Sequence, residues 1–234
     1  MTYKTASSYA KKLVLLCGLV CLPVQTISAQ TAPTSLEASK YTGLHLAAFQ
    51  GDTSALKKLI EEKEDLESRD SAGRTPIIVA AFASHEDIVR LLKDAGADIN
   101  ALENQAYDVV TIASVANDLP MLDVVLELGA SAGNITSPYD GTALIAAAHL
   151  GHHEVVKRLI DSKAPLDHIN NLHWTALIES VVLGDGGPNH IETAKHLLNA
   201  GADKSIGDRD GITPLEHAVS RGYKEMVDLF EQTR

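Results

Sequence analysis

Apolar residues in this chain fall into short blocks that recur with nearly constant spacing. A first block, such as "TALIAAAHLG" from Thr142, is followed by a second, such as "VVKRLI" from Val155. In the second block the apolar residues are spaced so that they lie on one face of a helix. The first blocks are 33, 33, 34, 33 and 38 residues apart and start at Thr42, Thr75, Asp108, Thr142, Thr175 and Thr213. A fixed period with two short helices in each unit predicts a stacked solenoid.

The two helices of each unit differ in the side chains with which they pack. In the second helix, Val155, Val156, Leu159 and Ile160 are spaced so that they lie on one face. The first helix carries small residues that let neighbouring helices approach closely: Ala47, Ala48, Ala80, Ala81, Ala146 and Ala147. Neither helix can bury its apolar face alone, so stability must come from the stacking of neighbouring units.

Polar residues and glycines mark the expected helix ends. Thr42 with His45 three residues later predicts mutual capping at the start of a first helix. Glycines suited to the left-handed residue that ends the second helix are Gly96, Gly129 and Gly201. Residues 30–40 predict a polar linker that ends in a partial N-terminal capping helix, and the last helix is expected to close the C-terminal end.

Five segments carry a recognisable repeat motif: "TGLHLAA", "TPIIVAA", "TPLEHA", "GHHEVVKRLI" and "AGADIN". In these segments the chain resembles the ankyrin repeat family. The resemblance covers residues 41–234 and implies an all-α solenoid of about six helix-turn-helix repeats with short finger turns. The chain departs from the family pattern at Asp108, in "KAPLD" and in an insertion at Asp185–Asn189. We expect the insertion to lengthen the turn between the helices of the fifth repeat, either as a second contact or as a tolerated change.

The first 29 residues have the pattern of a secretory signal peptide. Three lysines precede the apolar run 13–24, which is too short to span a membrane as a helix, and cleavage is expected after Ala29. The mature protein is therefore expected in the periplasm, or secreted beyond it, without membrane attachment. Both cysteines, Cys17 and Cys21, lie in the signal, so the mature chain would have no disulfide and no thiolate chemistry.

The chain is acidic, with a formal net charge of −11. The signal holds three lysines and no acids, so the mature chain has 17 basic residues against 31 acidic ones and a net charge of −14. This weighs against nucleic acid and anionic lipid as partners, because both require a cationic surface. A basic protein partner fits the charge, and so does a surface made acidic for solubility.

Motifs for catalysis are absent from the mature sequence. It contains no glycine-rich phosphate loop, no Cys/His zinc pattern, no GxSxG elbow and no HExxH helix. The acidic run from Glu61 to Asp70 does not alternate its carboxylates as a calcium loop requires. We therefore expect no enzymatic activity, no cofactor, and no catalytic or metal-binding residues.

Three histidines, His149, His152 and His153, lie within five residues and raise the question of a metal site. The eleventh position of the repeats holds Asp52, His85, Asp118, His152, His190 and Tyr223. At this position the family resemblance implies local hydrogen bonding at the start of the second helix. His153 is expected to face solvent, and adjacent rings at a helix start diverge, so we expect no shared metal ion.

Partner-binding residues are expected in two repeat positions. The residue before each repeat start lies at the finger, and the eighth residue lies on the exposed side of the first helix. The chain after residue 29 has eight aromatic residues, and five of them fall in these two positions. Together with nearby residues they define the predicted partner-binding set: Tyr41, Phe49, Arg74, Phe82, Tyr107, His149, Trp174 and Arg221. Tyr, Trp and Arg concentrate binding energy at interfaces, although packing within the repeats is the alternative role for each aromatic.

The resemblance implies a non-enzymatic, monomeric periplasmic protein that binds a protein partner through its concave face and fingers. Exported bacterial ankyrin proteins that look similar support a periplasmic catalase in oxidative stress, which implies catalase as one partner. The alternative is an immunity protein that neutralises a basic toxin acting in the periplasm. An enzyme built on the repeat scaffold is a remote third hypothesis. The sequence does not distinguish catalase from a toxin.

Overall fold

The computed structural model describes residues 32–233 of the chain, and the regular elements in this range are helices. The prediction of an all-α helix-turn-helix solenoid is confirmed. The segment predicted to be a signal peptide and both cysteines lie outside the described residues. No helix within residues 32–233 is long and apolar enough to cross a membrane. The helices are α1 (Ser35–Ala38), α2 (Gly43–Gln50), α3 (Thr53–Glu61), α4 (Pro76–Phe82), α5 (Glu86–Asp94), α6 (Val109–Val115), α7 (Leu119–Glu127), α8 (Ala143–His149), α9 (His153–Asp161), α10 (Ala176–Val182), α11 (Pro188–Asn199), α12 (Pro214–Arg221) and α13 (Lys224–Gln232).

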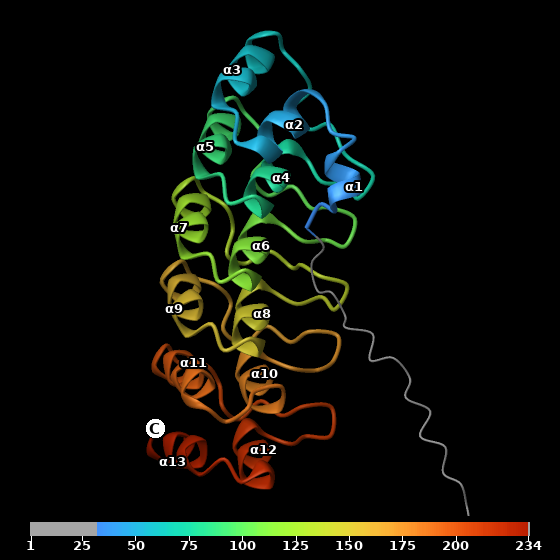
Figure 1. Cartoon of the computed structure of the whole chain (residues 1–234). Coiled ribbons are helices and arrows are strands. Elements are labelled where there is room, and N and C mark those ends of the chain that lie inside the picture. Colours follow the sequence, from blue (N-terminus) through green and yellow to red (C-terminus); the bar gives the residue numbers. More distant parts are fainter. Residues whose placement is uncertain (1–31, 234) are drawn as a thin grey trace, which may run out of the picture.

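The helices form two parallel columns (Figure 1). The inner column contains the even-numbered helices from α2 to α12, and the outer column contains the odd-numbered helices from α3 to α13. Each helix packs against its neighbours in the same column and against the other helix of its own repeat. The turns that join one repeat to the next project on the side away from the outer column, where they form a row of fingers (Figure 1).

The residues that start the six repeats are the N-cap residues of the inner helices. The Thr142 side chain, for example, accepts a hydrogen bond from the backbone N–H of Ile145. The described part of the chain begins with a short helix, α1, whose N-terminus is closed by a capping box between Thr34 and Glu37. The partial capping helix expected near residue 40 is therefore present.

The expected mutual capping of Thr42 and His45 is wrong. Thr42 makes no side-chain capping hydrogen bond, and the Glu64 carboxylate instead accepts from the backbone N–H of Leu44, at 3.2 Å. Gly43 has a φ of 52°, and a Cβ atom built on it would lie 2.5 Å from Glu64 Oε2. The missing side chain of Gly43 thus leaves room for a carboxylate that follows the outer helix α3 of the same repeat. The His45 ring lies 2.9 Å from the carbonyl oxygen of Arg74, in the next finger.

At the eleventh repeat position, Asp52 and Asp118 cap the start of their own outer helices, as local hydrogen bonding requires. The histidines and Tyr223 at this position bond across repeats instead, so for them the expectation of local hydrogen bonding is wrong. The His152 ring lies 3.0 Å from the carbonyl oxygen of Ser114, near the C-terminus of inner helix α6 in the preceding repeat. His85, His190 and Tyr223 make the same contact to Phe49, His149 and Gly184. Carbonyls at a helix C-terminus have no partner within their helix. This column of side chains therefore satisfies helix ends and joins consecutive repeats.

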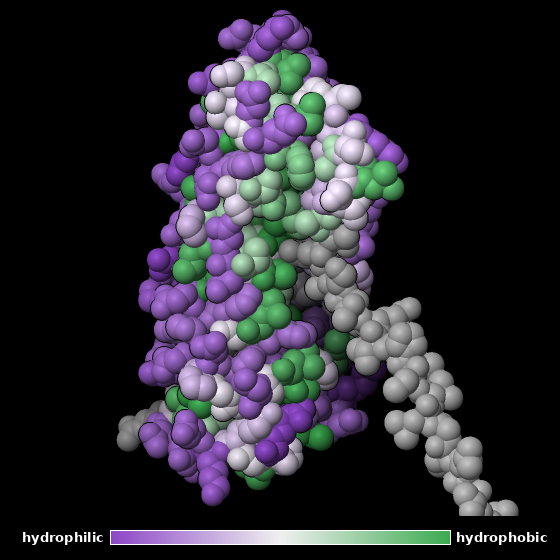
Figure 2. Space-filling model, viewed as in Figure 1, coloured by the Kyte–Doolittle hydropathy of each residue, from purple (hydrophilic) through white to green (hydrophobic). Residues whose placement is uncertain are grey.

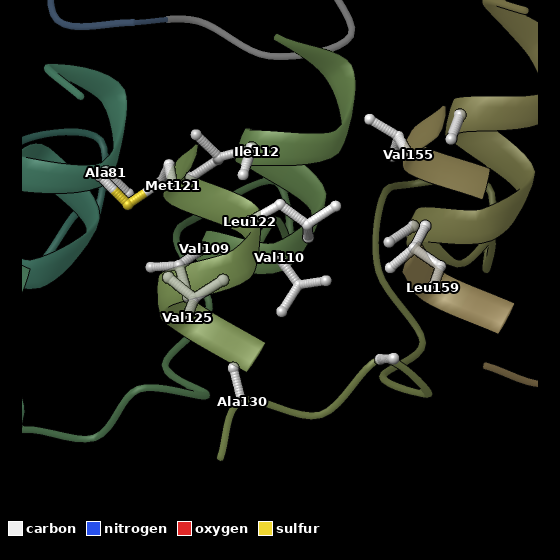
Figure 3. Close-up of a cluster of buried hydrophobic side chains, with 14 of the residues drawn as sticks. Ala81, Val109, Val110, Ile112, Met121, Leu122, Val125, Ala130, Val155 and Leu159 are labelled. Atoms are coloured by element: carbon white, nitrogen blue, oxygen red, sulfur yellow. The ribbon is translucent and has the colours of Figure 1, made fainter. Parts of the chain in front are cut away.

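The core lies between the two columns and extends through the stack. The sixth residue of each repeat is small and buried: Ala47, Ala80, Ala113, Ala147, Ser180 and Ala218. Figure 3 shows the middle of this core, where Met121, Leu122 and Val125 of α7 lie among side chains of neighbouring repeats. Small residues in the inner column and larger aliphatic residues in the outer column let the helices stack closely.

A residue in the left-handed conformation follows most of the outer helices, and three of these residues are the glycines predicted from the sequence. Gly96, Gly129 and Gly201 have φ angles of 105°, 88° and 94°. The fourth repeat, which contains "KAPLD", has Lys163 at the corresponding place with a φ of 67°. A residue with a Cβ atom is strained in this conformation, whereas glycine is not.

Replacing Lys163 by glycine is therefore expected to raise the free energy of unfolding by about 0.5–1 kcal/mol, because relief of left-handed strain exceeds the added entropy of the unfolded chain. Urea unfolding monitored by circular dichroism measures the change. As a control, Lys157→Gly within α9 should lower the stability by about 1 kcal/mol. Equal losses in the two variants would show that the position after α9 is not strained.

The insertion at Asp185–Asn189 does more than lengthen a turn. Helix α11 begins at Pro188 and has 12 residues, whereas α9 has nine, so part of the insertion extends the helix. Asp185 stabilises the turn that remains: its Oδ1 accepts the backbone N–H of Gly187 at 2.8 Å and lies 2.9 Å from His190 Nδ1. The insertion is thus ordered by its own hydrogen bonds.

Candidate functional site: an aromatic pocket under the fingers

Four of the fingers are closed by one polar side chain at the base of the turn. In the finger before the fifth repeat, Asn170 Oδ1 accepts the backbone N–H groups of Leu172 and Trp174, both at 3.0 Å. The corresponding residues in three other fingers are Asp70, Glu103 and Asp208. These four turns are therefore held by the same two backbone contacts, which set the direction of the residue before the repeat start. The finger before the fourth repeat is held instead by a backbone hydrogen bond from Thr136 to Gly141 and by Ser137 Oγ, which accepts the backbone N–H of Tyr139.

Adjacent fingers are also joined to one another. The backbone N–H of Asn104 donates to the carbonyl of Ala72 at 3.0 Å, and that of Asn171 donates to Tyr139 at 2.9 Å. A third bond joins Ser137 to Ala106 at 3.0 Å. The fingers thus form a continuous row, and side chains that point from them toward the inner helices are presented on an ordered frame.

A pocket of about 490 Å³ lies between the fingers and the inner helices of the third, fourth and fifth repeats. Its aromatic side chains come from the start of three successive repeats and their fingers: Tyr107, Tyr139 and Trp174. Helices α6, α8 and α10 contribute the opposite wall, which includes Thr111, Ile145, His149 and Glu179. The lining is mostly apolar with a few polar groups, which is the usual composition of a binding site.

Glu179 is the charged residue within this pocket. It is only 3% exposed, and its Oε1 accepts a hydrogen bond from the Nδ2 of Asn170, at 3.1 Å. Its Oε2 is buried and receives no hydrogen bond. Nδ1 of His149 lies 3.3 Å from Oε2, but it does not have hydrogen-bonding geometry, and the His149 side chain is 49% exposed at the rim. Leaving a buried charged oxygen without a donor is unfavourable.

A second group of polar residues lies at the N-terminal end, around Arg74. The Arg74 side chain is 1% exposed; its Nε donates to Asp70 Oδ2 at 2.7 Å and its Nη2 donates to Glu37 Oε1 at 2.8 Å. The Tyr41 hydroxyl donates to the same Asp70 oxygen at 2.6 Å. Burial works to raise the pKa of Asp70, but hydrogen bonds from Tyr41 and Arg74 outweigh it and hold this pKa below its usual value. Burial, with the hydrogen bond to Asp70, raises the pKa of Tyr41.

The structure separates the predicted partner-binding residues into groups. Tyr107, His149 and Trp174 line the aromatic pocket. Tyr41, Phe49 and Arg74 lie at the N-terminal end, where the Tyr41 and Phe49 rings meet edge to face with centroids 5.9 Å apart.

The remaining two predicted residues belong to neither group. Phe82 is partly buried against the core, and Arg221 is exposed and donates to the carbonyl of Val182 at 2.9 Å. Arg74 is almost completely buried, so it supports the surface more than it forms it, and Tyr107 is buried except where it lines the pocket. A contact between any of the eight residues and a partner stays a prediction.

Two residues of the pocket were missed in the sequence. Tyr139 lies within a finger and outside the two repeat positions that were compared. Glu179 had a visible signal, since it is the only Asp, Glu, Lys or Arg in the inner helices α2, α4, α6, α8 and α10. A single carboxylate in otherwise uncharged helices marks a special environment, and burial makes that environment costly unless a partner is present.

The three clustered histidines have separate environments. His149 lies at the rim of the pocket, and His152 bonds to the preceding repeat. The His153 side chain, expected to face solvent, is 33% exposed, and its ring stacks on that of His196 with centroids 6.2 Å apart. Within residues 32–233, no three His, Cys, Asp or Glu side chains are arranged to hold a metal ion.

The surface over the two columns differs in character. Figure 2 shows mostly hydrophilic residues over the outer helices and hydrophobic residues gathered along the middle of the same face, over the inner helices. Exposed apolar residues include Leu172 in a finger and Leu183 after α10, both of which line the pocket. The apolar surface at this site is therefore partly open to a partner.

Stacked helix pairs with an ordered row of fingers and a pocket beneath them define a repeat scaffold for protein binding. Comparison with known families identifies it: the model for ankyrin repeats (3 copies) matches residues 10–103 and 110–208. The chain belongs to the ankyrin repeat family, whose repeats serve as protein–protein interaction modules.

Similar proteins come from several bacteria. The chain is 33% identical over 185 residues to the putative ankyrin repeat protein YahD of Escherichia coli, covering 79% of this chain and 92% of YahD. An ankyrin repeat domain from Acinetobacter baumannii is 40% identical, with a TM-score of 0.76, covering 80% of this chain and 95% of that one.

A predatory endopeptidase from Bdellovibrio bacteriovorus in complex with an immunity protein contains a chain with the same fold. The matched chain of that complex is 22% identical to this one, with a TM-score of 0.69, and the match covers 83% of this chain and 99% of the other. Several other curated relatives are much longer proteins, of which this chain spans 42% or less.

Proposed function

We propose that this chain is an exported, non-enzymatic binding protein that holds a protein partner against its inner helices and fingers. The observation that carries the proposal is the aromatic pocket, in which Tyr107, Tyr139 and Trp174 converge from three repeats. Large aromatic side chains contribute much of the energy of protein interfaces, and here they lie beside exposed leucines on an ordered frame. Membership in the ankyrin repeat family supports the same role.

The proposed place of action is the periplasm. Its support is the pattern of the first 29 residues, with three lysines before a short apolar run. Fractionation of cells that produce the full chain, with mass spectrometry of its N-terminus, tests both the compartment and cleavage after Ala29. A full-length chain in the cytoplasm would contradict the proposal.

Replacing Trp174 by alanine is expected to weaken partner binding at least tenfold, since the change removes an interfacial anchor of about 2 kcal/mol. The side chain is only partly buried, so the thermal unfolding midpoint should change little. Residues 30–234 are used as bait with a periplasmic extract, and the captured protein is then purified and titrated against each variant. Lys57→Ala, on the exposed side of α3, is the matched surface control and should bind as the unaltered protein does. Equal affinity of both variants would exclude the pocket as the binding site.

Two candidate partner proteins each predict a distinct phenotype when the gene is deleted. A catalase is suggested by the resemblance to exported ankyrin proteins that support catalase in peroxide stress, and deletion of the gene should then lower peroxide resistance. A basic toxin is favoured by the net charge of −11, because opposite charge speeds capture. Deletion should then be harmful only while the toxin gene is intact. Identification of the captured protein distinguishes these two outcomes.

A further inference from the structure

We propose that the aromatic pocket is the anchor site for an arginine side chain of the protein partner. This inference rests on the proposed function, because it names the group by which a partner would be held. The charge within the pocket carries it: Glu179 is nearly fully buried, and its Oε2 receives no hydrogen bond.

The position of this oxygen determines what can occupy the pocket. Asn170 donates to Oε1, whereas Oε2 has no hydrogen-bond donor. Because Oε2 is buried beside His149, an incoming donor reaches it when the His149 ring moves aside. An anionic group would be repelled by the carboxylate, and an apolar side chain would cover Oε2 without satisfying it, at a cost in free energy. A cationic donor both pairs with the charge and makes the missing hydrogen bond.

The aromatic walls favour arginine among the cationic side chains. Tyr107, Tyr139 and Trp174 all line the space beside the carboxylate. A guanidinium group is planar, stacks on aromatic faces and sheds water more readily than an ammonium group does. A volume of about 490 Å³ accommodates the whole side chain.

His149 is the ionisable neighbour of the same oxygen and has to be considered as its resident partner. Its Nδ1 is 3.3 Å away, but the contact lacks hydrogen-bonding geometry. Half of the side chain is exposed at the rim, so the ring can turn outward when another group enters. The acidic net charge of the chain also favours a basic segment at this face.

The pocket contains its own reporter, because Trp174 is the only tryptophan in the chain. Residues 30–234 are titrated with N-acetyl-arginine methylamide while Trp174 fluorescence is followed. N-acetyl-citrulline methylamide, which has nearly the same shape but no charge, is the matched ligand. We expect a saturable response to the arginine probe, with a dissociation constant in the millimolar range, and about tenfold weaker binding of the citrulline probe.

The matched protein variants are Glu179→Gln and Glu61→Gln. Glu179→Gln keeps the size of the side chain and should weaken the arginine probe about tenfold while leaving the citrulline probe unchanged. Glu61→Gln removes one exposed charge on α3 and should change neither. Circular dichroism and thermal unfolding establish that each variant is folded.

Several results would overturn the assignment. These are equal binding of arginine and citrulline probes, an unchanged preference in Glu179→Gln, a stronger response to N-acetyl-lysine methylamide, or no saturable response at tens of millimolar. Failure here leaves the proposed function standing if Trp174→Ala still weakens capture of a protein partner. Conversely, selective arginine binding with no captured protein would support the pocket and count against the proposed function.

Discussion

Replacing Asp70 by alanine is expected to lower the free energy of unfolding by about 3 kcal/mol, because it leaves the buried Arg74 guanidinium without its closest partner. Asp70 is 6% exposed at its side chain and receives four hydrogen bonds, from Tyr41, Ala72 and twice from Arg74. Glu37 still pairs with Arg74 in the variant, which keeps the loss near the lower end of the range for a broken buried pair. Urea unfolding followed by circular dichroism measures the change.

The matched control is Asp70→Asn, which separates the charge from the turn. Asn170 closes its own finger through the same two backbone contacts, so an asparagine at position 70 should keep the first finger folded. The expected loss is therefore smaller than for alanine. If the two variants lose equal stability, the turn contacts of Asp70 contribute nothing beyond its ion pair.

The same control predicts how stability depends on pH. The pKa of Asp70 is lowered in the folded state, so its contribution is present above the unfolded pKa of about 3.9 and is lost as pH falls through the folded pKa. The unaltered protein should lose stability below about pH 4, and Asp70→Asn should lose less over the same interval. Unfolding midpoints measured at about pH 7 and about pH 3 test this. A parallel fall in both proteins would assign the acid sensitivity to other carboxylates.

Replacing Leu122 by alanine is expected to lower the free energy of unfolding by about 2–5 kcal/mol, through lost burial and the cavity that remains. Leu122 is fully buried on α7, which packs against α5, α6 and α9 in the middle of the stack (Figure 3). In a solenoid each repeat contacts only its neighbours, so a cavity here weakens the interfaces on both sides. Calorimetry and urea unfolding measure the loss.

Leu150→Ala provides the comparison for the cavity variant. Leu150 follows α8 and is exposed, so the substitution removes the same atoms without opening a cavity. Its expected effect is within about 0.5 kcal/mol. Similar losses for Leu122→Ala and Leu150→Ala would mean that the interior of the stack rearranges to fill the space.

The periodic part of the structure could be predicted from the sequence because it repeats. Spacing alone located the N-cap positions of the inner helices, and the glycine pattern located left-handed residues such as Gly96 and Gly201. Both signals are local, since a cap or a left-handed residue depends on a few neighbouring positions. Capping by Glu64 could not be anticipated in the same way, because that carboxylate follows the outer helix and lies 20 residues from the backbone N–H that it accepts.

Assignments that depended on contacts between repeats were less successful. His152 was correctly placed in a recurrent column, but its partner Ser114 lies 38 residues earlier in the chain. Arg74 was expected at the partner-binding surface, and the structure buries it against Asp70 and Glu37. A repeat position states which side of the helix a residue occupies, and it does not state whether a neighbouring repeat covers it.

The sequence by itself determined the class of fold, the number of repeats and the position of their helix starts, because hydrophobic spacing and caps act over a few residues. Only the tertiary structure decided which positions form a site. Tyr107, Tyr139 and Trp174 converge because successive fingers are joined. Glu179 is buried beneath the finger before the fifth repeat, whose Asn170 donates to its Oε1. Convergence and burial are properties of the stacked repeats, not of any one repeat.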